Sequence, residues 1–361
     1  MRPAILSTIF FVSFISLALN SPLNNQYLLT KENLRLISTK QNHAEWLNEI
    51  QILKLIQKGI KFIDVTDFVE YNSPLNTAEL PAKLNQDSTV QELIKKIDKL
   101  YMKKFLTTFT SFNTRYYRSK SGRESQQWLL EQLNLLKDKN KNEKVLLSVT
   151  EFEHTWGQNS IIFQIKPIEN DDGVVIIGAH QDSVNQWNPW FGRAPGADDD
   201  GSGSATIIEA LRVILHGGYT PKKVLEFHWY SGEEGGMLGS QKVAAKYRKD
   251  NVAVVGMLQV DMTGYVKSTK KEIIGISTDY MDPKLTNFLQ AVSKRYCLIP
   301  WGDMKCGYAC SDHVSWYNLG YPAAFTTESE MKDSSPYIHT TGDTVDTLNF
   351  NHMKEFVKLV L

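Results

Sequence analysis

A stretch rich in acidic and imidazole side chains is the first sign of chemistry in this chain. His180 and Asp182 follow the apolar, β-branched run at 174–177. A second polar cluster comes soon after, and its three consecutive aspartates are Asp198, Asp199 and Asp200. Like charges at this density are costly unless a cation neutralises them, so a metal site is the first hypothesis.

A structural role is the alternative for the same stretch. A helix is expected from about Gly203, because apolar residues recur at helical spacing until Gly217 and Gly218 end it. Asp200 or Ser202 could cap that helix. Capping accounts for one carboxylate and leaves two unexplained. Residues elsewhere in the chain are therefore needed to distinguish a metal site from a purely structural role.

The elements that must position these residues indicate an α/β fold. Strand-like runs lie at 145–150, 160–165, 174–177, 224–230, 252–260 and 273–277, and helices are expected from 203, near 241–248 and after Asp282-Pro283. Capping boxes at Thr89-x-x-Glu92 and Ser121-x-x-Glu124 predict two earlier helices. This alternation predicts one α/β domain over residues 88–361, with a mixed, largely parallel central sheet covered by helices on both faces.

Polar residues follow several of these predicted strands. Glu233 and Glu234 follow one strand, Asp261 follows the next, and His339 lies in a later polar segment. Each alone has an ordinary explanation as a solvated turn, a cap or a surface histidine. However, ligands bind beyond the carboxyl ends of strands in such sheets. Together with His180, these residues supply imidazoles and carboxylates without a lysine or arginine, which is what two zinc ions sharing one carboxylate require.

The N-terminal 87 residues are expected to be processed. Residues 1–18 combine a basic start, an apolar stretch and small residues at 16–18, which is typical of a signal peptide for secretion to the extracellular space. Residues 19–87 contain an amphipathic stretch from Trp46 to Ile56, ended by Gly59, and a short strand-like run at 62–65. We expect an intramolecular propeptide that packs on the catalytic domain, with a retained N-terminal subdomain as the alternative.

Composition narrows the range of partners. The 361 residues include 40 basic and 40 acidic side chains, so the formal net charge is zero. This balance gives no electrostatic reason for binding nucleic acid or an anionic membrane, and no later run predicts a membrane helix. A peptide or small molecule is the expected partner of a monomeric protein.

Cysteines are few. In an oxidising compartment Cys306 and Cys310 are close enough in sequence to form a disulfide, which would leave Cys297 free and buried. Three thiols are the alternative.

Six segments resemble the M28 family of co-catalytic zinc aminopeptidases, most closely the secreted leucine aminopeptidases of fungi and marine vibrios. They are Gly178–Ser183, Pro195–Gly203, Glu233–Gly235, Leu258–Thr263, Cys306–His313 and Ile338–Thr341. The resemblance runs from about Ser88 to the C-terminus with all segments in order. It implies two Zn²⁺ per chain and removal of N-terminal residues, preferably bulky and apolar ones such as leucine, from peptides with a free N-terminus.

The resemblance also implies a ligand set. His180 and Asp261 would bind one zinc, Glu234 and His339 the other, and Asp199 would bridge the two. The peptide bond between Asp199 and the neighbouring Asp200 would be cis.

Further roles follow from the same resemblance. Glu233 would be the general base, Tyr308 would donate a hydrogen bond to the developing oxyanion, and Asp182 would orient a ligating imidazole. The residues implied for the substrate pocket are Met262, Phe325, Met331 and Ile338. Thr327 and Ser334 stand where bacterial relatives carry aromatic residues, which predicts a wider or more polar pocket.

Two other activities are compatible with a similar fold. Carboxypeptidases and dipeptidases carry similar metal sets, but they need a cation to hold a C-terminal carboxylate, for which Arg193 is the candidate. Glutaminyl cyclase is a single-zinc acyltransferase, so metal stoichiometry separates it from a two-zinc peptidase.

Overall fold

The centre of the molecule is an eight-stranded mixed sheet. The computed structural model describes residues 34–68, 75, 79–169 and 173–361, so the predicted signal peptide lies outside the described residues. The strands run in the order β10-β9-β11-β8-β6-β7-β5-β4. Their bounds are β4 (Val145–Phe152), β5 (Ser160–Pro167), β6 (Val174–His180), β7 (Val224–Tyr230), β8 (Val254–Val260), β9 (Ile274–Ser277), β10 (Trp301–Met304) and β11 (Ala323–Thr327).

The middle of this sheet is parallel. Strands β11, β8, β6 and β7 are parallel neighbours, whereas β5 and β4 extend one side in antiparallel fashion. On the other side β9 is antiparallel to β11 and parallel to β10. The predicted mixed, largely parallel sheet is therefore confirmed.

Helices cover both faces because the strands are apolar on both sides. In β5, Ile161, Phe163 and Ile165 join one buried cluster and Ile162 joins another, as the two-residue period of a strand requires. The first cluster includes residues of α3 (Asp87–Ile94), α4 (Lys99–Phe109), α5 (Lys120–Lys139), α6 (Gly201–His216), α8 (Pro283–Tyr296) and α10 (Phe350–Val360). The second includes residues of α7 (Leu238–Lys249) and α9 (His313–Tyr317).

Two of the predicted helix starts are wrong, by three residues for α3 and by two residues for α5. Helix α3 begins at Asp87 after Gln86, so Thr89 lies inside it. Helix α5 is capped by Ser119, whose hydroxyl accepts from the Gly122 amide at 2.9 Å, because a turn closed by tertiary contacts precedes it. The Ser121 hydroxyl donates instead to a backbone carbonyl outside the helix.

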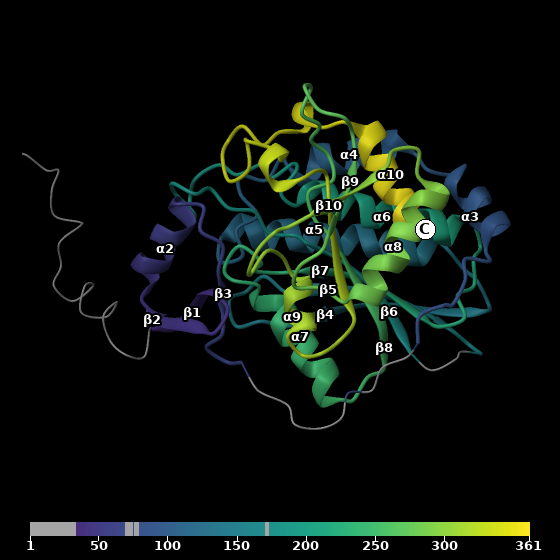
Figure 1. The fold of residues 1–361 in the computed structure, drawn as a ribbon, viewed down its shortest axis with the longest axis horizontal. Coiled ribbons are helices and arrows are strands. Elements are labelled where there is room, and N and C mark those ends of the chain that lie inside the picture. Colours follow the sequence, from purple (N-terminus) through teal and green to yellow (C-terminus); the bar gives the residue numbers. More distant parts are fainter. Residues whose placement is uncertain (1–33, 69–74, 76–78, 170–172) are drawn as a thin grey trace, which may run out of the picture.

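A small separate unit precedes the large domain, and we call residues 34–68 the N-terminal unit. It contains β1 (Arg35–Lys40), β2 (His43–Leu47), β3 (Ile63–Asp64) and α2 (Glu49–Gln57), and its sheet has the order β2-β1-β3. Figure 1 shows it in purple at one side of the domain. Trp46, predicted to lie on the amphipathic helix, belongs to β2 and is 55% exposed.

The unit buries its apolar face against the domain. Ile37, Ile56 and Phe62 share a cluster with Tyr117 and Val184 of the domain. Whether residues 19–87 are a propeptide or a retained subdomain stays a prediction.

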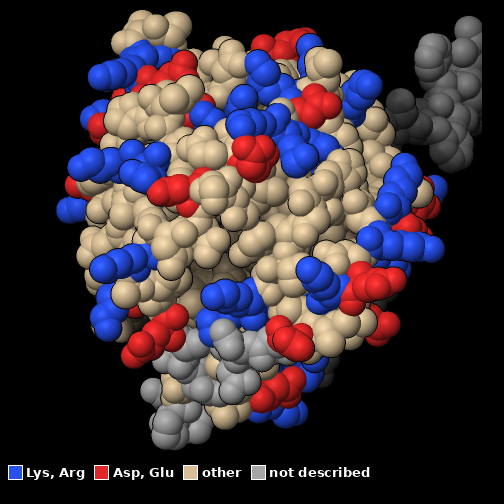
Figure 2. Space-filling view, turned by 90° about the vertical axis from the view of Figure 1, so that its right-hand side faces the viewer, with Lys and Arg blue, Asp and Glu red and all other residues tan. Residues whose placement is uncertain are grey.

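Charge is mixed on the surface as the composition predicts. Figure 2 shows basic and acidic side chains interspersed over the face that it presents. None of the helices in the described part of the chain combines the length and apolar character needed to cross a bilayer.

Candidate active site

The predicted ligands meet at the carboxyl edge of the parallel strands. His180 is the last residue of β6, Asp261 directly follows β8, and Glu233 and Glu234 lie in the turn after β7. Because β7, β6 and β8 are parallel neighbours, their carboxyl ends bring these residues together. Asp199 comes from the loop before α6.

The carboxylate of Asp199 lies between two imidazoles. Its Oδ1 is 3.1 Å from His180 Nε2, and its Oδ2 is 3.0 Å from His339 Nε2. Asp261 Oδ1 is 3.6 Å from the same nitrogen of His180, and Glu234 Oε2 is 3.0 Å from that of His339. The arrangement is two half-sites that share one carboxylate.

Five polar atoms of this cluster are buried without a hydrogen-bond partner among the described residues. They are His180 Nε2, Asp199 Oδ2, Glu234 Oε1, Asp261 Oδ1 and His339 Nε2. Buried polar atoms are rarely left unpaired, and imidazole nitrogens and carboxylate oxygens are the ligands that zinc accepts. The residues therefore fit the implied metal.

Asp200 has a different role from Asp199. Its carboxylate accepts from the amides of His180 at 3.0 Å, Gly203 at 2.9 Å and Met262 at 3.1 Å. It therefore caps α6, as the structural alternative proposed, and ties together three segments of the site. The peptide bond between Asp199 and Asp200 is cis, as the resemblance implies.

Asp182 supports the general-base candidate as well as the imidazole. Its two carboxylate oxygens accept from the amides of Glu233 and Glu234 at 3.1 and 3.2 Å. His180 Nδ1 lies 3.2 Å from the Asp182 carbonyl oxygen and 3.5 Å from its carboxylate. One aspartate thus positions the turn after β7 and lies against the ring of His180.

Glu233 carries its carboxyl group beside this cluster and is 4% exposed. Burial raises the pKa of Glu233, whereas the nearby ammonium group of Lys61 acts in the opposite direction. Glu233 is not needed as a ligand, because the half-site of Glu234 already has three donor residues, Glu234, His339 and Asp199. Glu233 is thus available for proton transfer.

Some supporting residues were missed by the sequence analysis. The carboxylate of Asp343 accepts from the amides of Asp198 and Asp199 at 2.8 and 3.1 Å, and so orients the loop of the shared carboxylate. Ser311 donates to Asp261 Oδ2 at 2.6 Å. Both residues lie in or beside segments already singled out, so their position in those segments was the available signal.

The buried Arg115 was also missed. Its guanidinium donates to the carbonyls of Gln181 at 2.8 Å, Gly196 at 2.8 Å, and Pro195. It therefore joins the loop after His180 to the loop before Asp199. Its own surroundings in the sequence carry no motif.

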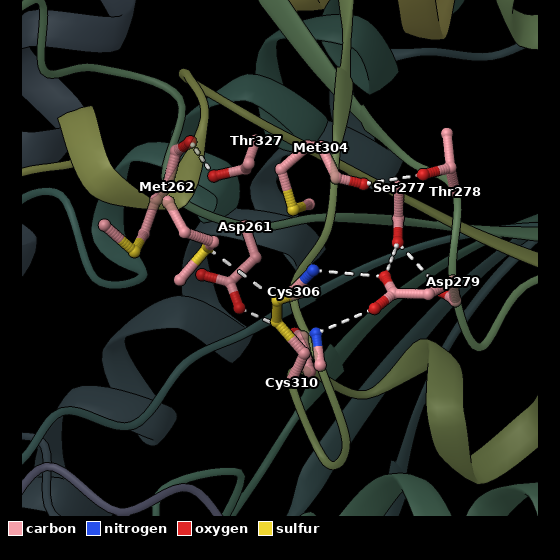
Figure 3. Close-up of a disulfide and its surroundings, with 12 residues drawn as sticks. Asp261, Met262, Ser277, Thr278, Asp279, Met304, Cys306, Cys310 and Thr327 are labelled. Carbon is pink, nitrogen blue, oxygen red and sulfur yellow. Dashed lines mark hydrogen bonds between the residues drawn. A yellow bond between two sulfur atoms is a disulfide. The ribbon is translucent and has the colours of Figure 1, made fainter.

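Tyr308 lies on a loop that a disulfide closes. Cys306 and Cys310 form this disulfide, and Asp279 accepts from the amides of Cys306 and Gly307 at 3.1 and 2.9 Å (Figure 3). The Tyr308 hydroxyl lies 2.8 Å from the Ser38 hydroxyl of the N-terminal unit. Cys297 is a free, partly buried thiol, as expected.

Three of the four predicted pocket residues, Phe325, Met331 and Met262, lie around the same disulfide. Phe325 packs with Met304 and Cys310, and Met331 Sδ lies 3.8 Å from Cys306 Sγ. Met262 follows Asp261, as Figure 3 shows, and Ile338 precedes His339. Their role in substrate binding stays a prediction.

Arg193 does not support the carboxypeptidase alternative. Its guanidinium donates to the carbonyls of Phe112 at 2.6 Å and Thr110 at 3.0 Å. These bonds engage two of its nitrogens with backbone outside the ligand cluster.

An α/β sheet with imidazoles and a shared carboxylate at its carboxyl edge defines a metal-dependent hydrolase. Residues 160–361 match the peptidase family M28, and the chain belongs to this family. It is a hydrolase of the aminopeptidase class, as the sequence predicted.

The chain is similar to known aminopeptidases along most of its length. Leucine aminopeptidase 1 of Emericella nidulans is 46% identical over 340 residues, covering 90% of this chain and 86% of the relative. Leucine aminopeptidase 1 of Sclerotinia sclerotiorum is 44% identical over 342 residues, covering 90% and 87%. The structure of the LapA aminopeptidase of Legionella pneumophila is 29% identical with a TM-score of 0.79, and covers 91% of each chain.

Proposed function

We propose that this protein is a secreted two-zinc aminopeptidase that removes N-terminal residues from peptides, preferably bulky apolar ones such as leucine. The observation that carries the proposal is the carboxylate of Asp199, whose two oxygens face His180 and His339 at 3.1 and 3.0 Å. A carboxylate shared in this way is typical of co-catalytic metal pairs. The leucine preference rests on the relatives that carry this name.

Five residues would hold the metal pair: His180 and Asp261 on one side, Glu234 and His339 on the other, and Asp199 between them. When bound, zinc supplies a Lewis acid for the scissile carbonyl and lowers the pKa of a water molecule.

Proton transfer is assigned to Glu233. Its carboxylate would accept the proton of the attacking water and later deliver it to the leaving amine. The two hydrogen bonds that the Asp182 carboxylate accepts from the amides of Glu233 and Glu234 hold Glu233 in place for both steps.

Tyr308 is assigned to the oxyanion. Its hydroxyl would donate to the oxygen on which negative charge develops in the transition state. In the present structure this hydroxyl contacts Ser38, so the N-terminal unit has to move before Tyr308 can serve a substrate.

Substrate recognition would depend on the free N-terminus and on apolar surface. A free α-amine would be held by the metal pair that Glu234, His339, Asp199, His180 and Asp261 bind, whereas the nitrogen of an acylated N-terminus is a poor ligand. The apolar surface around Phe325 and Met331 would receive the first side chain.

We propose further that residues 1–18 are a signal peptide and residues 19–87 a propeptide, which leaves residues 88–361 as the catalytic domain, acting as a monomer. The contact of Ser38 with Tyr308 supports an inhibitory role for the propeptide, because it engages a residue assigned to catalysis.

Hydrolysis of leucyl peptides tests the proposal. Protein processed near Ser88 is compared on an unblocked peptide, its N-acetylated form and its C-amidated form. We expect cleavage of the unblocked and amidated peptides only. Cleavage of the acetylated peptide with loss of the amidated one would assign the site to a carboxypeptidase.

A further inference from the structure

The N-terminal unit covers the candidate active site. Ile56, Gly59, Ile60, Lys61 and Phe62 line one side of a cavity whose other side is Glu233, Glu234, Gly236 and His339. The remaining space is about 30 Å³. Since pockets for small ligands have volumes of about 300–1,000 Å³, no peptide substrate fits beneath this cover.

Lys61 is the cation in this cover. Helix α2 ends at Gln57 with Lys58 as its C-cap, and Gly59 adopts a φ of +64° that turns the chain toward the site. The side chain of Lys61 is partly buried in the shared cavity. Burial alone would lower the pKa of Lys61, but the carboxylates of Glu233, Asp199, Glu234 and Asp261 raise it overall, so the ammonium stays charged.

Lys61 acts on these carboxylates through space. Within the described residues, no hydrogen bond or ion pair closer than 4 Å involves its side chain. It therefore offsets part of the negative charge of the whole cluster instead of pairing with one carboxylate, and leaves each ligand atom available.

Contacts on the same side of the unit hold Lys61 over the cluster. The Asp64 amide donates to the Gly236 carbonyl at 3.1 Å, and the Arg35 guanidinium donates to the Gly235 carbonyl. A Cβ added to Gly236 would lie 2.9 Å from the Asp64 nitrogen, so the two backbones meet closely here. These bonds attach the unit to the turn that carries Glu233 and Glu234.

We propose that the positive charge of Lys61 acts on the metal site and couples the binding of the N-terminal unit to the binding of zinc by the enzyme. The inference rests on the proposed function and deepens its regulation. Without zinc, Lys61 attracts the acidic cluster and holds the unit in place. With zinc bound, the added positive charge repels Lys61 and weakens that hold. By linkage, the covered enzyme must bind zinc less tightly than it would without Lys61.

Zinc affinity of the uncleaved chain tests the coupling. It is measured by competition with a chelator for the wild type, Lys61→Met, Lys61→Arg and the matched control Lys58→Met, whose lysine is exposed on the same segment. We expect Lys61→Met to bind zinc at least about tenfold more tightly, because a unit charge near a divalent cation repels it appreciably in a protein environment. Lys61→Arg and Lys58→Met should match the wild type.

Retention of the unit after cleavage is the second measurement. Protein cut near Ser88 is passed over a size-exclusion column with zinc or with a chelator. We expect the wild-type unit to stay bound more firmly in the chelator than in zinc, and the Lys61→Met unit to show no such dependence.

Three results overturn the proposal. Equal or weaker zinc binding by Lys61→Met refutes the coupling alone, as does a wild-type unit whose retention is independent of zinc. Absence of zinc binding in every variant, cleaved or not, refutes the proposed function along with it.

Discussion

Replacing Asp182 by asparagine tests how the site is held together. The carboxylate accepts from the Glu233 and Glu234 amides at 3.1 and 3.2 Å, and is fully buried. Asparagine keeps one acceptor oxygen but turns an NH₂ group toward the second amide. One hydrogen bond to a charged group is lost, and a buried N–H is left unpaired.

The expected cost follows from these two losses. A hydrogen bond to a charged group contributes about 1.5–3 kcal/mol, and an unpaired buried donor costs about 1–3 kcal/mol. Because these two contributions overlap, they do not add in full. We therefore expect the unfolding free energy to fall by about 2–4 kcal/mol. Loss of a residue that orients metal ligands lowers metal affinity by about 10–100-fold.

Two assays separate these effects. Urea denaturation of the zinc-free chain measures stability, and chelator competition measures zinc affinity. Asp138→Asn is the control, because Asp138 is exposed at the end of α5, where its pair with Lys137 at 3.7 Å contributes little. Unchanged stability of Asp182→Asn would refute the role of its carboxylate in holding the turn. Unchanged zinc affinity would refute its role in positioning the ligands.

Four further results are expected. Glu233→Gln should lower the rate by about 100-fold or more with zinc content unchanged; loss of zinc would instead make Glu233 a ligand. Asp199→Asn should release both zinc ions together, and selective loss of one would contradict a bridge. Burial raises the pKa of Cys297 to about 12, so alkylation at pH 8 should be much slower in the folded than in the urea-unfolded chain, and equal rates would show an accessible thiolate. Burial lowers the pKa of His154 to about 4, below the unfolded value of about 6.5. Its contribution to stability is therefore full above pH 6.5 and is lost as the pH falls toward 4. His154→Gln should flatten the dependence of the unfolding free energy on pH over that range, and an unchanged dependence would refute this.

Sequence patterns predicted the sheet and the residues that follow its strands. His180, Glu234 and Asp261 could be grouped because parallel strands end at one edge, a rule that needs no knowledge of side-chain packing. His339 follows no strand, and only its polar segment and the resemblance to a known family placed it with them.

The remaining features depend on contacts between distant segments. Ser38 and Tyr308 are 270 residues apart in sequence, and Lys61 meets the acidic cluster only because the N-terminal unit folds over it. Similarly, Ser119 and not Ser121 caps α5, since a preceding turn set by tertiary contacts decides between two similar patterns. Local propensity cannot rank such choices.

A zinc-edge anomalous difference map of crystals of the zinc-loaded protein tests the central claim most directly. The account predicts two peaks roughly 3.5–4 Å apart on either side of the Asp199 carboxylate, one beside His180 and Asp261 and the other beside Glu234 and His339. A single peak, or a pair of peaks that Asp199 does not bridge, would contradict it.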